Sequence, residues 1–111
     1  MKLILFSNDN VGKQALCYLS ENFIDDLQLV VTTEKNDIYD EARKKNIRCF
    51  SLKDDGDLIT EITESKLKFD LGILAWRPKI ICSEIMSLAP SGFINFHPSL
   101  LPYNRGKNYN F

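Results

Sequence analysis

Short apolar runs alternate along the chain with longer segments in which apolar and polar residues mix. The runs predict five buried strands, at 2–7, 27–33, 47–51, 70–76 and 92–97. The segments between them carry apolar residues at helical spacing and predict helices at 10–22, 36–46, 58–67 and 84–89. Regular alternation of strands and helices is typical of a parallel, doubly wound α/β sheet. We therefore predict this Rossmann-like fold class, in one domain spanning residues 1–111.

Local signals refine two of the helices. Asn36 or Asp37 is expected to cap the second helix, which has basic residues in its last turn. The acidic stretch 53–57, KDDGD, predicts a turn that leads into the third helix. A metal-binding or phosphate-responsive loop is the alternative interpretation of this stretch, and a solvated loop is the interpretation that we favour.

Composition narrows the class of protein. The chain of 111 residues is 44% hydrophobic and 26% charged, as in ordinary globular domains, and its net charge of −1 gives no general attraction to nucleic acid or to anionic membranes. The apolar run near residue 1 is too short for a signal peptide or a spanning helix, so we expect a cytoplasmic protein without a membrane partner. Cys17, Cys49 and Cys82 are predicted to be buried free thiols, and one histidine without clustered cysteines gives no zinc site.

Polar loops follow three of the predicted strands at what we expect to be one edge of the sheet. In doubly wound sheets the ligand lies beyond the carboxyl ends of the strands, where the strand order reverses. The loops 7–10 and 76–79 should flank that crevice, and the loop after the fifth strand begins at His97. Asn8 and Asn10 precede a helix, where backbone N–H groups can bind an anion such as phosphate, or where the two side chains cap the helix. The glycine fingerprint of dinucleotide-binding folds is absent.

Asn95 and His97, the single histidine, form the candidate catalytic pair. Residues two apart on a strand point to the same face, and the following Pro98 restricts His97 to extended backbone. An amide donor beside an imidazole can stabilise a developing negative charge and move a proton at neutral pH. From the chemistry alone, catalytic and structural roles both stay open.

The segment 95–106, NFHPSLLPYNRG, resembles the signature of the folate-dependent formyltransferases. The residues in register are Asn95, His97, Ser99, Leu100, Leu101, Pro102, Arg105 and Gly106. That family includes glycinamide ribonucleotide, methionyl-tRNA and nucleotide-sugar formyltransferases, and formyltetrahydrofolate deformylase. The ending RGKNYNF looks more like the nucleotide-sugar or uncharacterised formyltransferase-like members than like the methionyl-tRNA enzyme. The resemblance extends over the whole chain and implies the family's Rossmann-like amino-terminal domain.

The resemblance also implies an activity. It is the transfer of a formyl group from 10-formyltetrahydrofolate to a primary amine of a small, phosphate-bearing substrate. In this family Asn95 would stabilise the oxyanion and His97 would assist proton transfer. The segment after the fourth strand resembles the folate-binding stretch, here Arg77, Pro78, Lys79, Ile80 and Ile81. Substrate contacts are expected from Asn8, Asn10, Ser99 and Arg105.

One family residue has no counterpart in the sequence. The aspartate that orients the histidine in the family lies further along its chains, and this sequence reaches only Phe111. We therefore expect a truncated domain with little activity of its own. The alternatives are a non-catalytic folate- or nucleotide-binding module, a formyltetrahydrofolate hydrolase and a fragment of a methionyl-tRNA formyltransferase. The acceptor amine and the oligomeric state are not determined by the sequence.

Overall fold

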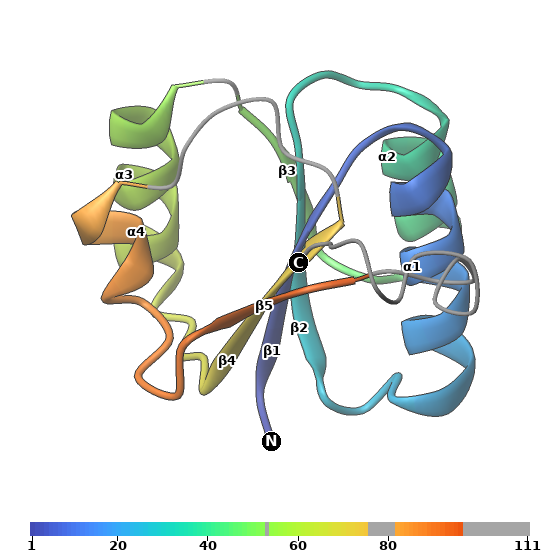
Figure 1. Cartoon of the computed structure of the whole chain (residues 1–111). Helices are drawn as coiled ribbons and strands as arrows, with labels where there is room; N and C mark the ends of the chain where they lie inside the picture. Colours follow the sequence, from blue (N-terminus) through green and yellow to red (C-terminus); the bar gives the residue numbers. More distant parts are fainter. Residues whose placement is uncertain (53, 76–81, 97–111) are drawn as a thin grey trace, which may run out of the picture.

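The computed structural model describes residues 1–52, 54–75 and 82–96, which fold into alternating strands and helices (Figure 1). In chain order these elements are β1 (Leu3–Ser7), α1 (Asp9–Asn22), β2 (Leu27–Thr32), α2 (Asp37–Lys44), β3 (Cys49–Ser51), α3 (Asp55–Ser65), β4 (Leu71–Ala75), α4 (Ser83–Met86) and β5 (Phe93–Asn95). None of the described helices combines the length and the apolar character needed to cross a membrane.

The five strands form one parallel sheet in the order β3-β2-β1-β4-β5. Helices α1 and α2 cover one face, and α3 and α4 cover the other (Figure 1). The chain winds outward from β1 to β3, crosses back to β4 beside β1, and continues to β5, so the order reverses between β1 and β4. The predicted doubly wound fold is confirmed.

Each face of the sheet buries its own apolar cluster. On the side of α1 and α2, the sheet contributes Leu5, Val30 and Ile73. On the side of α3 and α4 it contributes Ile4, Phe6, Leu29 and Val31. All five residues of β1 are buried, because this central strand is covered on both faces. The candidate site described below lies at the carboxyl end of this central strand and of its neighbours on the β4 side.

β5 is held against β4 by a close contact between an aromatic ring and a glycine. Gly72 pairs with Phe93 in the register of the two strands. A Cβ atom at Gly72 would overlap the Phe93 ring, so glycine leaves the space in which the ring lies. The ring also contacts Phe6 of β1, with centroids 5.9 Å apart. Phe93 thereby ties β5 to its neighbour β4 and, beyond it, to β1.

The structure corrects the predicted start of the third helix. Residues 55–57 belong to α3 instead of a turn. Asp54 caps this helix, because its carboxylate accepts a hydrogen bond of 3.0 Å from the backbone nitrogen of Asp57. The predicted cap of α2 is confirmed for Asn36, whose side chain accepts from the nitrogen of Tyr39 at 3.1 Å.

The cysteines differ from one another in exposure. Cys49 is buried in β3 as expected, whereas Cys82 is partly buried. The prediction for Cys17 is wrong, because this thiol is exposed. It lies on the solvent side of α1, whose buried face is formed by Gly12, Ala15, Leu16 and Leu19.

Candidate functional site

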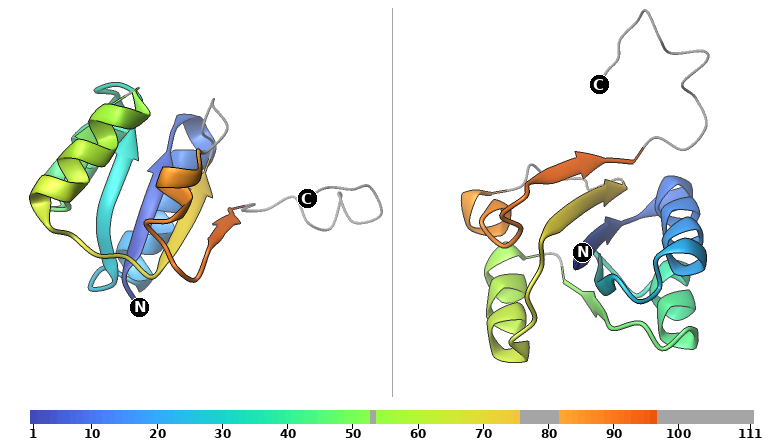
Figure 2. Two further views of the ribbon diagram at one scale, coloured as in Figure 1. Left: turned by 90° about the vertical axis from the view of Figure 1, so that its left-hand side faces the viewer. Right: turned by 90° about the horizontal axis from the view of Figure 1, so that it is seen from below.

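The carboxyl ends of β1, β4 and β5 lie next to one another at one edge of the sheet. Phe6 of β1 is level with Leu74 of β4, and Leu74 is level with Asn95 of β5. Because neighbouring strands lie about 4.8 Å apart, Asn95 is about 10 Å from β1 across the sheet. Figure 2 shows the strands side by side, with their arrowheads toward this edge. The sheet therefore brings together strand ends that are far apart in sequence.

Asn8 connects three strands at this edge. Its backbone nitrogen donates to the carbonyl of Ala75 at the end of β4, at 3.1 Å. Its side-chain Oδ1 accepts from the backbone nitrogen of Thr33 at 3.2 Å and from the Thr33 hydroxyl at 3.1 Å. Asn8 occupies the cap position of α1, but its side chain makes no capping hydrogen bond. Only 5% of the Asn8 surface is exposed. Through its bonds to Thr33, Asn8 holds the loop after β2 at the switch point.

The first turn of α1 approaches the end of β1 closely. The Ser7 hydroxyl donates to the carbonyl of Gly12 at 2.6 Å, and a Cβ at Gly12 would lie 2.6 Å from the same hydroxyl oxygen. Asp9 begins the helix with a positive φ of 58°, which is unusual for a residue other than glycine. Asn10 follows in the first turn and is exposed at the same edge. Its side chain is thus accessible to a ligand, whereas that of Asn8 is buried.

An ion pair joins the beginnings of α1 and α2 near this edge. Lys13 Nζ lies 2.7 Å from Asp37 Oδ2. The hydrogen bond and charge of Asp37 raise the pKa of Lys13, and the hydrogen bond from Lys13 lowers the pKa of Asp37. Both groups are exposed to solvent, so the pair is expected to contribute little to stability.

Asn95 ends β5 and is exposed. Together with Ile94 and Phe96 it lines a groove of about 290 Å³ between β5 and α1, whose other wall includes Tyr18 and Leu19. Phe96 is anchored there because its nitrogen donates to the carbonyl of Leu74 at 2.9 Å. Asn95 is thereby fixed between two residues that are held by their neighbours, Ile94 in the ladder and Phe96 by this bond.

Several of the predicted site residues lie outside the described residues. They are Arg77, Pro78, Lys79, Ile80, Ile81, His97, Ser99 and Arg105. The described residues that flank 76–81 are Ala75, at the carboxyl end of β4, and Cys82, directly before α4. In the sequence, the segment 76–81 follows β4 and His97 comes two residues after β5. The carboxyl ends of these two neighbouring strands lie at the same edge of the sheet.

Sequence reasoning missed Thr33 and the role of Ser7. Thr33 holds the Asn8 side chain, and Ser7 holds the first turn of α1. The signal available was weak: each is a polar residue at the end of an apolar strand. Within the described ranges, no three histidine, cysteine, aspartate or glutamate side chains gather where they could hold a metal ion.

Comparison with known proteins points to one enzyme family. No protein-family model matches the chain. A stretch of 40 residues is 40% identical to a methionyl-tRNA formyltransferase of Roseiflexus castenholzii (strain DSM 13941 / HLO8), covering 36% of this chain and 13% of that relative. The methionyl-tRNA formyltransferase of Roseiflexus sp. (strain RS-1) matches with the same identity over 40 residues, 12% of its length. The fold is similar to the crystal structure of phosphoribosylglycinamide formyltransferase from Streptococcus pneumoniae TIGR4, with a TM-score of 0.65. The resemblance to the formyltransferases is confirmed.

The solved structure and the two sequence relatives support different aspects of the similarity to formyltransferases. The Streptococcus structure shares 19% identity and supports the fold, over 91% of this chain and 58% of that one. The two Roseiflexus formyltransferases supply the sequence likeness, over a matched stretch that is about an eighth of their length. The finer likeness to nucleotide-sugar formyltransferases is not confirmed by these relatives and stays a prediction.

Proposed function

We propose that the chain is the amino-terminal part of a formyltransferase that transfers a formyl group from 10-formyltetrahydrofolate to a primary amine. The observation that carries the proposal is the place of Asn95, at the carboxyl end of β5 and beside the switch point between β1 and β4. Ligands of doubly wound sheets bind at this edge. The sequence match to two formyltransferases supports the reaction class.

Asn95 and His97 are assigned complementary parts of the reaction. When bound, 10-formyltetrahydrofolate would supply the formyl group: the amine nitrogen would first add to the formyl carbon, and the bond from that carbon to the folate nitrogen would break afterwards. Asn95 would donate a hydrogen bond from its amide nitrogen to the formyl oxygen, where negative charge develops. His97 would accept the proton that the amine loses and pass it to the departing folate nitrogen.

Folate is proposed to lie along the segment 77–81, between β4 and α4. The flanks of that segment fit this proposal, because Ala75 is hydrogen-bonded to Asn8 at the switch point. Acceptor contacts are assigned to Asn10, Ser99 and Arg105. The buried side chain of Asn8 is assigned the positioning of the loop that precedes Asn10, since it is bonded to Thr33.

Paired measurements of turnover and folate affinity test the proposal. The 111-residue chain alone should transfer little, since the resemblance places the orienting aspartate beyond Phe111. In a polypeptide extended to include that aspartate, Asn95→Ala should lower turnover by about 10²-fold or more, and His97→Ala at least as much. The affinity for tetrahydrofolate and the melting temperature should stay unchanged in both variants.

Asn22→Ala is the matched control, because Asn22 is an exposed asparagine at the end of α1, away from the site. It should keep full turnover. Near-normal turnover of Asn95→Ala would contradict the catalytic assignment. Joint loss of folding and folate binding in that variant would show that the motif is structural.

Methionyl-tRNA is a second candidate acceptor. The sequence match to the two Roseiflexus enzymes favours it over other amines. The net charge of −1 gives no general electrostatic attraction to RNA, so we would expect tight RNA binding to need contacts from a longer protein. Comparing methionyl-tRNA with a nucleotide-linked amino sugar as acceptors in one assay decides between the two.

A further inference from the structure

A second hollow lies at the opposite edge of the sheet from Asn95. It has a volume of about 530 Å³ and lies between the end of α3 and the connection from α4 to β5. Phe69 lines it just before β4, and Pro90 lines it shortly before β5, which places it at the amino edge of these strands. It is therefore separate from the edge where formyl transfer is proposed.

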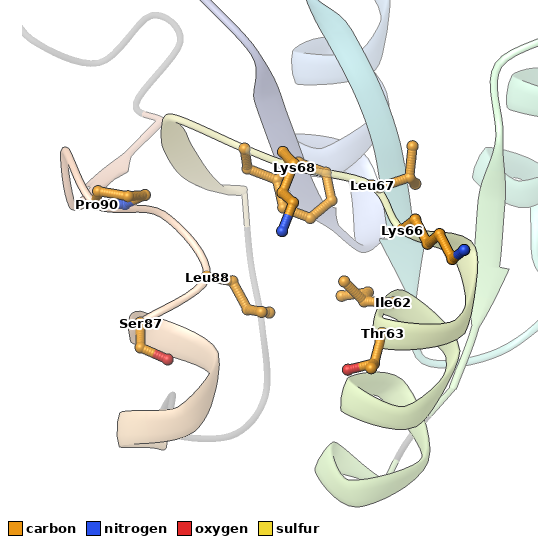
Figure 3. Close-up of a pocket in the computed structure, with 9 residues that line it drawn as sticks. Ile62, Thr63, Lys66, Leu67, Lys68, Ser87, Leu88 and Pro90 are labelled. Atoms are coloured by element: carbon orange, nitrogen blue, oxygen red, sulfur yellow. The ribbon is translucent and has the colours of Figure 1, made fainter.

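The floor of this hollow is apolar. Ile62 and Phe69 are buried members of the core on the side of α3 and α4, and Leu67 and Leu88 pack against the same core. Figure 3 shows Ile62 and Leu88 pointing toward one another from opposite walls. An apolar ligand body placed between them would remove this surface from water, at about 25 cal/mol per Å².

The rim is polar and positively charged. The hydroxyl groups of Thr63 and Ser87 face one another across the opening, and the ammonium group of Lys68 points down into it (Figure 3). Lys66 also lines the hollow but extends away from its centre in the same view. Among the described residues neither lysine is in an ion pair, and no carboxylate lines the hollow. The charge that Lys68 presents is thus available to an anion.

We infer that this hollow binds a small amphipathic carboxylate, with its aromatic or branched apolar body between Ile62 and Leu88 and its carboxylate at Lys68. Its volume lies in the usual range for small-molecule pockets, which are mostly apolar with a few convergent polar groups. Thr63 can donate a second hydrogen bond to the carboxylate. The Ser87 hydroxyl already donates to the carbonyl of Glu84 at 2.7 Å and so acts as an acceptor only.

Naphthalene-2-carboxylate is a suitable probe, titrated into the ¹⁵N-labelled 111-residue chain and followed by two-dimensional NMR. The amide signals of residues 62–69 and 87–92 should shift together and saturate. Lys68→Glu should weaken binding about fivefold or more, because an attraction of up to about 1 kcal/mol becomes a repulsion. Naphthalene-2-carboxamide, which is uncharged, should bind more weakly by a similar factor.

Lys44→Glu is the matched control, since Lys44 is exposed at the end of α2 on the other face of the sheet. It should leave the affinity unchanged. Unaltered binding by Lys68→Glu, equal weakening by Lys44→Glu, or the absence of any saturable shift would overturn the inference. Shifts confined to the groove beside Ile94 would overturn it as well, by assigning the probe to the other apolar surface.

Discussion

The ring of Phe93 occupies the space above Gly72 that any other residue would fill with its own Cβ. The two residues are partners in the register of β4 and β5, and Asn95 follows Phe93 by two positions on the same strand. The placement of the candidate catalytic amide therefore depends on a glycine in the neighbouring strand. Because Gly72 has no side chain, it would contribute to the site only through this packing.

Gly72→Ala should destabilise the chain by about 1–3 kcal/mol, because the added methyl forces the Phe93 ring out of its position. Urea unfolding measures the change in the free energy of unfolding. In a Phe93→Ala background the same substitution should cost less, since the overlapping ring is gone. Equal costs in both backgrounds would show that Gly72 is needed for another reason.

Asn8→Ala should cost about 1–3 kcal/mol, because it leaves the partly buried backbone nitrogen of Thr33 without the Oδ1 acceptor of Asn8. Asn8→Asp retains an oxygen at that position and should cost less. Thermal unfolding of the two variants provides the comparison. If Asp were as damaging as Ala, the hydrogen bonds to Thr33 would not be the reason that asparagine is needed.

The Lys13–Asp37 ion pair should contribute to stability only over a defined pH window. The pKa of Asp37 is lowered from 3.8, so its contribution is present above that value and is lost as pH falls through the lowered pKa. The pKa of Lys13 is raised from 10.5, so its contribution is present below that value and is lost as pH rises through the raised pKa. Asp37→Asn should therefore be less stable than the parent at neutral pH, and equal to it in strong acid.

The effect of Asp37→Asn should be small and should shrink in high salt, because both groups are exposed. Asp40→Asn is the control. Asp40 lies in the same first turn of α2 but is not part of this pair, so it reports only the interaction with the helix dipole. A pH-independent difference between Asp37→Asn and the parent would contradict the ion-pair explanation.

The cysteines should differ in their reaction with iodoacetamide. Burial raises the pKa of Cys49 to about 12, so about 10⁻⁴ of this thiol is ionised at pH 8. Cys17 is exposed and should be modified first in the folded chain. Mass spectrometry of tryptic peptides follows each site. Cys49 should react only after unfolding in guanidinium, and equal rates for both in the folded state would contradict the burial of Cys49.

The sequence predicted the fold well because buried parallel strands appear as continuous apolar runs. β1 is the clearest case, since all five of its residues are buried. The start of α3 was missed because Asp54, Asp55 and Gly56 are typical of a turn, and their role as a helix start depends on the Asp54 cap. Cys17 was misjudged because apolar character alone does not place a residue on the inner face of α1.

The candidate site was predictable as an edge, and less so in its individual roles. The switch-point rule predicted correctly that the carboxyl ends of β1, β4 and β5 lie at one edge of the sheet. These strands end at Ser7, Ala75 and Asn95. The bond from Thr33 to Asn8 spans 25 residues and depends on how β1 and β2 align, which no local pattern specifies. The position of Ile94 and Asn95 relative to the groove beside α1 likewise depends on the register of β5 with β4.

β5 has only three residues, and within the described part of the chain it pairs with β4 alone. Its opening breaks few hydrogen bonds, so its amide protons should exchange faster than those of the fully buried β1. Asn95 is then aligned only in the fraction of molecules in which this strand is closed, and the observed rate scales with that fraction. A segment that covers the free side of β5 would therefore raise turnover through the population of the closed strand, without contacting folate or the amine.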